Sequence, residues 1–204
     1  LLQLILSESL VQNAGLIEAL KNEVDKILNH QENLYDIQNR DEVIDYLPPL
    51  IKQGEIMSGK YDVYITNPPY MGGSMNAKLS EFVKKNYPDT KSDLFAVFME
   101  LDTHLVKPNG FVGMINQHSW MFLSTFEKYR KNLINSRTII NMLHLGPRTF
   151  EEISGEVVQS TSYILRKDRE EDYIGEFIRL IDYKTSIKKE QKTIEAIKNT
   201  KCGY

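Results

Sequence analysis

Cysteine and long apolar runs are scarce in this chain of 204 residues. The single cysteine, Cys202, excludes a disulfide framework and a cluster of thiolate metal ligands, and it favours a reducing, cytoplasmic location. The apolar stretch at the start, residues 1–6, is too short for a signal peptide or a membrane span. We therefore expect no membrane partner.

The chain also lacks a large excess of charge of either sign. It has 25 Lys and Arg residues against 28 Asp and Glu residues, a net charge of -3, so the total charge does not require a polyanionic partner. The hydrophobic fraction of 41% and the charged fraction of 26% are ordinary for a soluble globular protein. These values exclude collagen-like, coiled-coil and wholly disordered chains.

The spacing of apolar residues predicts strands that alternate with helices. Short runs rich in Val, Ile and Tyr predict strands at 61–66, 111–115, 138–145, 157–165 and 176–183. Amphipathic spacing predicts helices at 10–28, 77–86, 94–106, 125–134 and 184–201. This order predicts an α/β fold with a mostly parallel sheet, and the charged segment 166–172 predicts that the last two strands form an antiparallel hairpin.

Two helix starts and one helix end are predicted from capping and breaking residues. Asp41 is a candidate N-cap of a second, shorter helix, which the pair Pro48-Pro49 should break or kink. Ser92 or Asp93 is the candidate N-cap of the apolar helix that follows.

The most informative segment is Asn67-Pro68-Pro69-Tyr70, directly after the first predicted strand. The two prolines fix their φ angles and hold Asn67 in an extended conformation, so the loop is stiff. The Asn67 side-chain carbonyl and the Pro68 backbone carbonyl are two acceptors that can hold both hydrogens of one amino group. Tyr70 adds an aromatic face. The arrangement suits the exocyclic amine of a flat heterocycle at the carboxyl end of a strand, where open α/β sheets bind ligands. The competing interpretation is a proline-rich turn with Tyr70 packed in the core.

The stretch YDVYITNPPY resembles the catalytic motif of amino-methyltransferases that use S-adenosylmethionine, in particular the N6-adenine DNA methyltransferases of restriction–modification systems. The later stretches SDLFAVFMELDTHLVKPNGFVGMI and LGPRTFEEISGEVVQSTSYILRK agree with that family in order and spacing. The whole stretch is particularly similar to the PglX methyltransferases of BREX phage-defence systems. The resemblance covers 61–183, and it implies part of a Rossmann-like class I methyltransferase fold.

The resemblance implies methyl transfer from S-adenosylmethionine to the N6 amino group of an adenine flipped out of double-stranded DNA. Asn67 and the Pro68 carbonyl would accept hydrogen bonds from that amine, Pro69 would stiffen the loop, and Tyr70 would stack on the base. Phe150 would be a second aromatic side chain near the target base, and Phe98 would contact the adenine of the cofactor. Loop packing explains Phe150, and core packing explains Phe98, equally simply. Subunits of a defence system are possible further partners.

Other residues carry weaker signals. His118 and Trp120 follow the second predicted strand, where they either line the pocket or are packed in the interior. Four basic residues are candidate phosphate contacts or simply part of a solvated helix surface: Lys128, Arg130, Lys131 and Arg137.

The glycine-rich loop with which this family binds its cofactor is absent from the chain, because no Gly-x-Gly occurs before Tyr61. We expect that loop to precede Leu1 and the DNA-reading domain to follow Tyr204, so the chain alone should be inactive. The expected organisation is an N-terminal helical segment at 1–60, the C-terminal half of the catalytic domain at 61–183, and a Lys-rich helical tail or linker at 184–204.

Two alternatives to a DNA adenine methyltransferase are open at the level of the sequence. An amino-methyltransferase that acts on protein glutamine or on RNA needs the same pair of acceptors, because an amide or a guanine amine poses the same problem. A non-catalytic interaction module of a defence complex is consistent with the missing glycine loop. The region upstream of Leu1 and the region beyond Tyr204 would distinguish these hypotheses.

Overall fold

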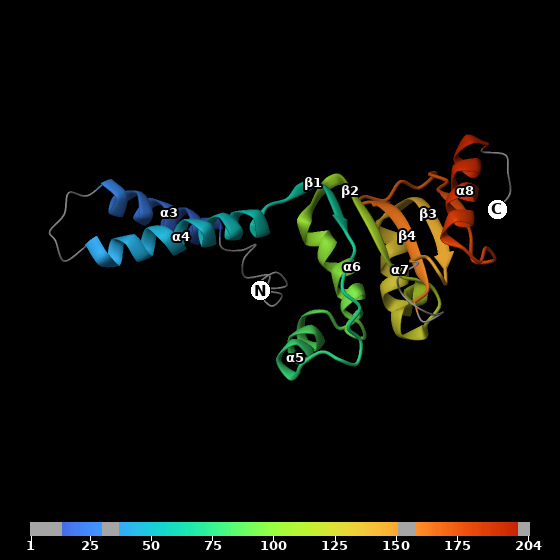
Figure 1. Ribbon diagram of the computed structural model, residues 1–204, viewed down its shortest axis with the longest axis horizontal. Coiled ribbons are helices and arrows are strands. Elements are labelled where there is room, and N and C mark those ends of the chain that lie inside the picture. The colour runs from blue at the N-terminus through green and yellow to red at the C-terminus, as the bar shows by residue number, and fades with distance from the viewer. Residues whose placement is uncertain (1–13, 30–36, 151–157, 200–204) are drawn as a thin grey trace. The chain divides into compact units, whose positions relative to one another are not determined.

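The computed structural model describes residues 14–29, 37–150 and 158–199 (Figure 1). The chain divides into two compact units, residues 1–60 and residues 61–204. None of the described helices combines the length and the apolar character that a membrane crossing requires.

The first unit contains two helices, α3 (Ala14–Asn29) and α4 (Ile37–Ser58), that pack against each other. The predicted first helix is thereby confirmed from Ala14 onward, and residues 10–13 lie outside the described residues. The shared apolar contact consists of Ile17, Leu20, Val24, Leu47 and Ile51.

The prediction for the second helix is wrong in two respects. Helix α4 begins at Ile37, so Asp41 lies within it rather than at its start, and the helix continues through Pro48 and Pro49. A proline removes one backbone donor and disfavours the turn before it. Here Leu47 and Ile51, on either side of the proline pair, pack against α3, and this packing holds the helical path.

The second unit is built on a five-stranded sheet. Its strands are β1 (Tyr61–Thr66), β2 (Val106–Gln117), β3 (Thr138–Gly146), β4 (Ser160–Arg166) and β5 (Glu176–Arg179). The spatial order is β1-β2-β4-β3-β5. The β1–β2 and β3–β5 pairs are parallel, whereas β4 is antiparallel to both of its neighbours. Four strands therefore run in one direction and β4 alone is reversed, as a mostly parallel sheet requires.

The predicted late hairpin is wrong in its pairing. Strand β4 is inserted between β2 and β3, so both of its edges are already hydrogen-bonded and none is left for β5. Strand β5 pairs instead with the free edge of β3. A strand was predicted at the place of β4 in the chain, but both partners of β4 precede it in the sequence.

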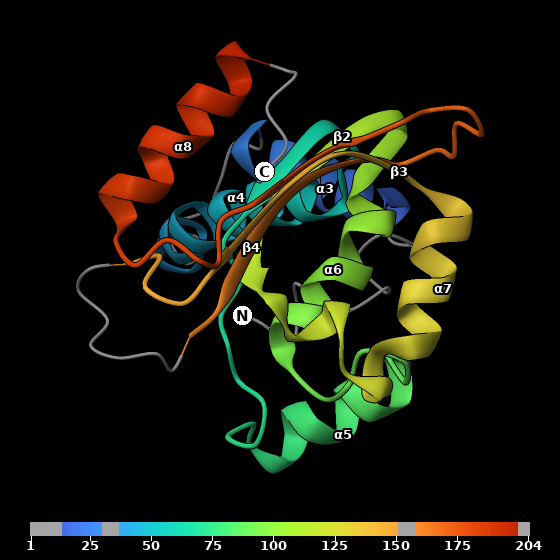
Figure 2. The ribbon, with the colours of Figure 1, turned by 90° about the vertical axis from the view of Figure 1, so that its right-hand side faces the viewer.

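The helices of this unit lie on both sides of the sheet. They are α5 (Ala77–Asn86), α6 (Leu94–Leu105), α7 (Glu127–Ser136) and α8 (Ser186–Lys198), with short 3₁₀ turns η1 (His118–Met121) and η2 (Ser124–Phe126). Figure 2 shows α6 and α7 on one face of the sheet and α8 on the other side. The main core fills the space between the sheet and the helices α6 and α7. It consists of Phe95, Ala96, Met99, Val106, Val112, Met114, Trp120, Phe126, Tyr129, Leu133, Met142, Tyr163 and Leu165.

Candidate active site

The segment Asn67–Tyr70 leaves the sheet at the carboxyl end of β1, as predicted. Strand β1 ends at Thr66, which pairs with Met114 of the parallel strand β2. Asn67 and Pro69 are exposed, and Pro68 is buried. Asn67 is therefore accessible from solvent, while the buried ring of Pro68 anchors the loop.

The N-cap of α6 ties this loop to the core. Asp93, rather than Ser92, caps the helix, and one of its carboxylate oxygens accepts hydrogen bonds from the backbone N–H groups of Phe95 (3.4 Å) and Met71 (2.9 Å). A Cβ atom added at Gly72 would lie 3.1 Å from the other Asp93 oxygen, so a glycine suits this approach. The sequence indicated only the cap. The second bond, to the residue after Tyr70, spans 22 positions and left no local signal.

Tyr70 is held against the core by its ring. The ring meets Phe95 edge to face, with the two centroids 6.0 Å apart. Burial raises the pKa of the Tyr70 hydroxyl, and the nearby Ser160 hydroxyl opposes this rise. Within residues 14–29, 37–150 and 158–199, neither of these buried hydroxyl oxygens has a partner that meets hydrogen-bond geometry, so Ser160 is near Tyr70 without a well-formed bond to it. Tyr70 is only partly buried, so core packing accounts for part of its surface and leaves the rest available.

Phe150 lies in the turn after β3, which opens onto the same edge of the sheet. Gly146 adopts a φ of 67°, and a Cβ atom there would lie 2.7 Å from Ile181, so the turn requires glycine. The Thr149 hydroxyl donates to the Gly146 carbonyl, 3.0 Å away. The described residues show no ring contact between Phe150 and Tyr70, and the structure does not bring these two aromatic side chains together.

Phe98 differs from its neighbours on α6. Phe95, Val97 and Met99 are fully buried, whereas Phe98 is partly exposed and does not belong to the main core. Its side chain is thus accessible to a ligand, as a contact with a cofactor would require.

A known protein family matches this chain over most of its length. The Eco57I restriction-modification methylase model matches residues 2–150, more than half of the chain. The chain belongs to this family. It is 49% identical over 156 residues to the adenine-specific methyltransferase PglX of Lacticaseibacillus casei (strain Zhang), covering 76% of this chain and 13% of the relative. It is 44% identical to the adenine-specific methyltransferase BrxX of Escherichia coli O9:H4 (strain HS), covering 81% of this chain and 14% of the relative. The chain thus spans about one seventh of the length of these two curated relatives.

Solved structures confirm the fold class. A Listeria monocytogenes protein assigned to the class I S-adenosylmethionine-dependent methyltransferases aligns with a TM-score of 0.50 at 19% identity, over 69% of this chain and 43% of that one. The Type ISP restriction-modification enzyme LlaGI, in complex with a DNA substrate mimic, aligns with a TM-score of 0.50 at 16% identity, over 65% of this chain and 16% of that one. The predicted α/β methyltransferase fold is therefore confirmed for this member of the Eco57I family.

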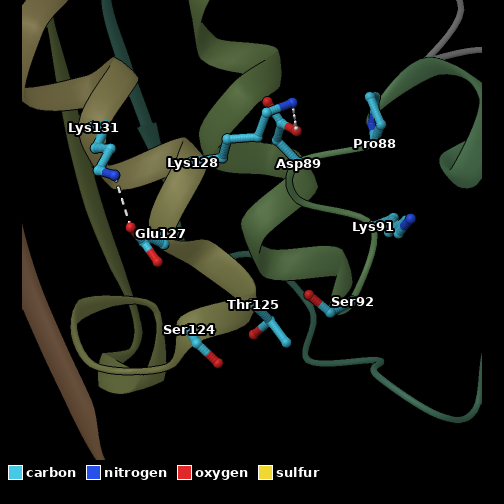
Figure 3. A pocket seen from close by; sticks show the side chains of 9 residues that line it. All are labelled: Pro88, Asp89, Lys91, Ser92, Ser124, Thr125, Glu127, Lys128 and Lys131. Atoms are coloured by element: carbon cyan, nitrogen blue, oxygen red, sulfur yellow. Dashed lines mark hydrogen bonds and ion pairs between the residues drawn. The ribbon is translucent and has the colours of Figure 1, made fainter.

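A second feature of this chain lies between the start of α6 and the start of α7. It is a cleft of about 510 Å³, and Figure 3 shows the side chains around it. Two of its lysines form ion pairs, Lys128 with Asp89 (3.1 Å) and Lys131 with Glu127 (2.7 Å). The lining residues are Pro88, Asp89, Lys91, Ser92, Ser124, Thr125, Glu127, Lys128 and Lys131.

Arg137 is not available to a phosphate. It is buried and forms an ion pair with Asp102, whose carboxylate oxygen lies 2.5 Å away. Burial raises the pKa of Asp102, and the guanidinium of Arg137 counteracts that rise. The interpretation of Arg137 as a phosphate contact is therefore wrong, because the core needs its charge to balance a buried carboxylate.

Trp120 and His118 have different roles. Trp120 is buried, and its indole N–H donates to Asn116, 3.2 Å away, so interior packing was the right alternative. His118 is half-buried, with its Nδ1 atom 2.8 Å from Nε2 of His144. Burial lowers the pKa of both imidazoles. The described residues hold no group of three or more His, Cys, Asp or Glu side chains that is arranged to bind a metal ion.

Proposed function

We propose that this chain supplies the catalytic loop of an enzyme that transfers a methyl group from S-adenosylmethionine to the N6 amino group of adenine in DNA. The observation that carries the proposal is the exposed Asn67 beside the buried Pro68 at the carboxyl end of β1, in a chain of the Eco57I methylase family. The names of the relatives PglX and BrxX support adenine as the target.

The loop acts by placing two acceptors at fixed positions. The Asn67 side-chain oxygen and the Pro68 carbonyl would each accept one hydrogen of the adenine amine, which directs the lone pair of the nitrogen away from the ring system. That lone pair forms the new nitrogen–carbon bond, and the amine then loses one proton to solvent. Such catalysis depends on orientation and on fixed dipoles, so it needs no strong base in the loop.

The aromatic side chains would hold the flipped base. Tyr70 keeps part of its ring accessible while Phe95 holds its edge, so we propose that the base stacks on Tyr70. A stack of this kind is worth about 1–3 kcal/mol per base. Phe150 is proposed to approach the base from the turn after β3, on the same edge of the sheet.

The described residues fit part of a site for S-adenosylmethionine. Phe98 is a partly exposed aromatic side chain on α6. We propose that Phe98 contacts the adenine ring of the cofactor. When bound, S-adenosylmethionine supplies a methyl group on a sulfonium centre, which takes up the electron pair of the broken carbon–sulfur bond.

The substitution Asn67→Ala in the complete protein tests the proposal. We expect the formation of N6-methyladenine in DNA, measured by mass spectrometry, to fall by at least about a hundredfold, the scale of losing one fixed hydrogen-bonding group in a transition state. Binding of S-adenosylmethionine, measured by calorimetry, should change little. Asn132→Ala, at an exposed position of α7, is the matched control and should keep full activity.

Two results would contradict the proposal. If Asn67→Ala retains methyl transfer, the loop is not catalytic. If cofactor binding falls as much as methyl transfer, Asn67 has a structural role instead.

A further inference from the structure

Two bulky apolar side chains, Phe122 and Leu123, project from the turn that follows β2. Phe122 is 59% exposed and Leu123 is 52% exposed. We call these two residues the apolar tip. Leaving such side chains in water costs the free energy that their burial would give. Two adjacent exposed apolar side chains on a fixed backbone therefore indicate an interaction site.

The backbone of the tip is indeed fixed. The guanidinium of Arg130, on α7, donates to the carbonyl of Trp120 (2.7 Å) and to that of Leu123 (2.5 Å), one on each side of Phe122. Trp120 is itself anchored in the core through Asn116. The tip is thus presented by a rigid turn, and its exposure does not result from a loose loop.

The Phe122 ring has defined neighbours on one side. It meets His118 edge to face at a centroid distance of 5.3 Å and lies 5.7 Å from His144. These contacts set the direction of the ring and leave its remaining surface exposed.

The tip is on the same edge of the sheet as the proposed catalytic loop. The turn begins where His118 donates its backbone N–H to the Gln159 carbonyl, 2.8 Å away. The next residue, Ser160, pairs with Gln117 and lies close to the Tyr70 hydroxyl. The chain of contacts from Tyr70 to the turn therefore passes through Ser160 and Gln159.

The surroundings of the tip suit a nucleic acid. The two residues that follow it, Ser124 and Thr125, line the cleft that also carries Lys91, Lys128 and Lys131 (Figure 3). The cleft also carries Asp89 and Glu127, which pair with Lys128 and Lys131, so its lysines exceed its carboxylates by one. An apolar pair next to hydroxyl groups and this small positive excess matches a base stack bordered by phosphates. A protein interface is usually built on a wider apolar centre.

We propose that Phe122 and Leu123 form a wedge that enters the DNA base stack beside the flipped adenine. This inference rests on the proposed function, because flipping a base leaves a gap in the duplex that an apolar side chain can fill. The wedge holds the duplex open while the loop at Asn67 holds the base.

The affinity for a duplex with a gap tests the wedge without requiring methyl transfer. A 30-base-pair duplex with one abasic position and the same duplex without it are compared by fluorescence anisotropy, with the complete protein. We expect the protein to bind the abasic duplex about tenfold more tightly, the scale of one base stack. The double variant Phe122→Ala/Leu123→Ala should lose this preference.

Phe177→Ala is the matched control. Phe177 is 57% exposed, like Phe122, but it lies on β5, where it pairs with Met142 of β3 and is not part of the turn after β2. This variant should keep both the preference for the abasic duplex and the rate of methylation. Phe122→Leu, which restores an apolar side chain, should recover most of the preference.

Three results would overturn the inference. The first is that the protein shows no preference for the abasic duplex. The second is that the double variant keeps the preference. The third is that the double variant melts several degrees below the unchanged protein and binds DNA as that protein does. The third result would mean that the tip packs against another part of the protein. A protein that prefers the abasic duplex but never methylates adenine would instead contradict the proposed function alone.

Discussion

The loops that leave β1 and β2 are both rigid, but they are held by different means. The loop after β1 is stiffened by its own covalent structure, through Pro68 and Pro69, and by one carboxylate, that of Asp93. The turn after β2 contains no proline and is held by side chains from elsewhere, chiefly Arg130 on α7 and Asn116 inside the sheet.

This difference suits the two roles that we propose. A catalytic acceptor must keep its position in every state of the enzyme, and proline rings restrict the backbone without needing contacts from the rest of the fold. A wedge must resist the force of the base stack, which requires anchoring to the core. The side chains of the β2 turn therefore divide into anchors, such as Trp120, and an exposed tip, Phe122 with Leu123.

The largest effect should come from removing an anchor. Trp120→Ala deletes a buried indole and leaves the Asn116 side-chain oxygen without its donor, so we expect the free energy of unfolding to fall by about 3–5 kcal/mol. Urea unfolding followed by circular dichroism measures this loss. Phe122→Ala, two residues away, should cost less than about 1 kcal/mol. Equal losses would refute the division into anchors and tip.

The next effect concerns the loop after β1. Asp93→Ala removes a helix cap, worth about 1 kcal/mol, and also the bond to the Met71 N–H. Because small displacements of catalytic groups are costly, we expect kcat for methyl transfer to fall about tenfold or more.

A second cap in the chain provides the control for Asp93. The Asn76 side chain caps α5 by accepting from the Leu79 N–H, 2.9 Å away, and it makes no bond to the catalytic loop. Asn76→Ala should lose a similar amount of stability and keep its kcat. If both variants lose activity alike, the bond from Asp93 to Met71 does not position the loop.

The same contrast explains what the sequence could predict. Strand β1, helix α5 and the stiffness of Asn67–Tyr70 depend on neighbouring residues, so local patterns were sufficient. The pairing of His118 with His144 joins residues 26 positions apart. The two histidines meet because β4 lies between β2 and β3 and fixes the spacing of these strands. The residues near each histidine in the sequence do not indicate this strand order.

The errors have a related cause. Pro48 and Pro49 were expected to break a helix that packing against α3 maintains, and Arg137 was expected at the surface although it balances the buried Asp102. In both cases a tertiary contact overrides a sound local rule. The motif at Asn67 could be predicted because the groups that give it its chemistry lie in consecutive residues.

The smallest expected effect is a dependence of stability on pH at the base of the β2 turn. Burial holds the pKa of His118 and His144 below the usual value of 6.5, and the positive charges of His118, Arg179 and Lys189 lower that of His144 further. As the pH falls through 6.5, these two histidines therefore take up protons more readily in the unfolded chain than in the folded one. Their contribution to stability is fully present above that pH and is lost as the pH falls further. His144→Gln should reduce the fall in melting temperature between pH 7.5 and pH 5.5. An unchanged fall in His144→Gln would show that the histidine pair does not couple protonation to the turn.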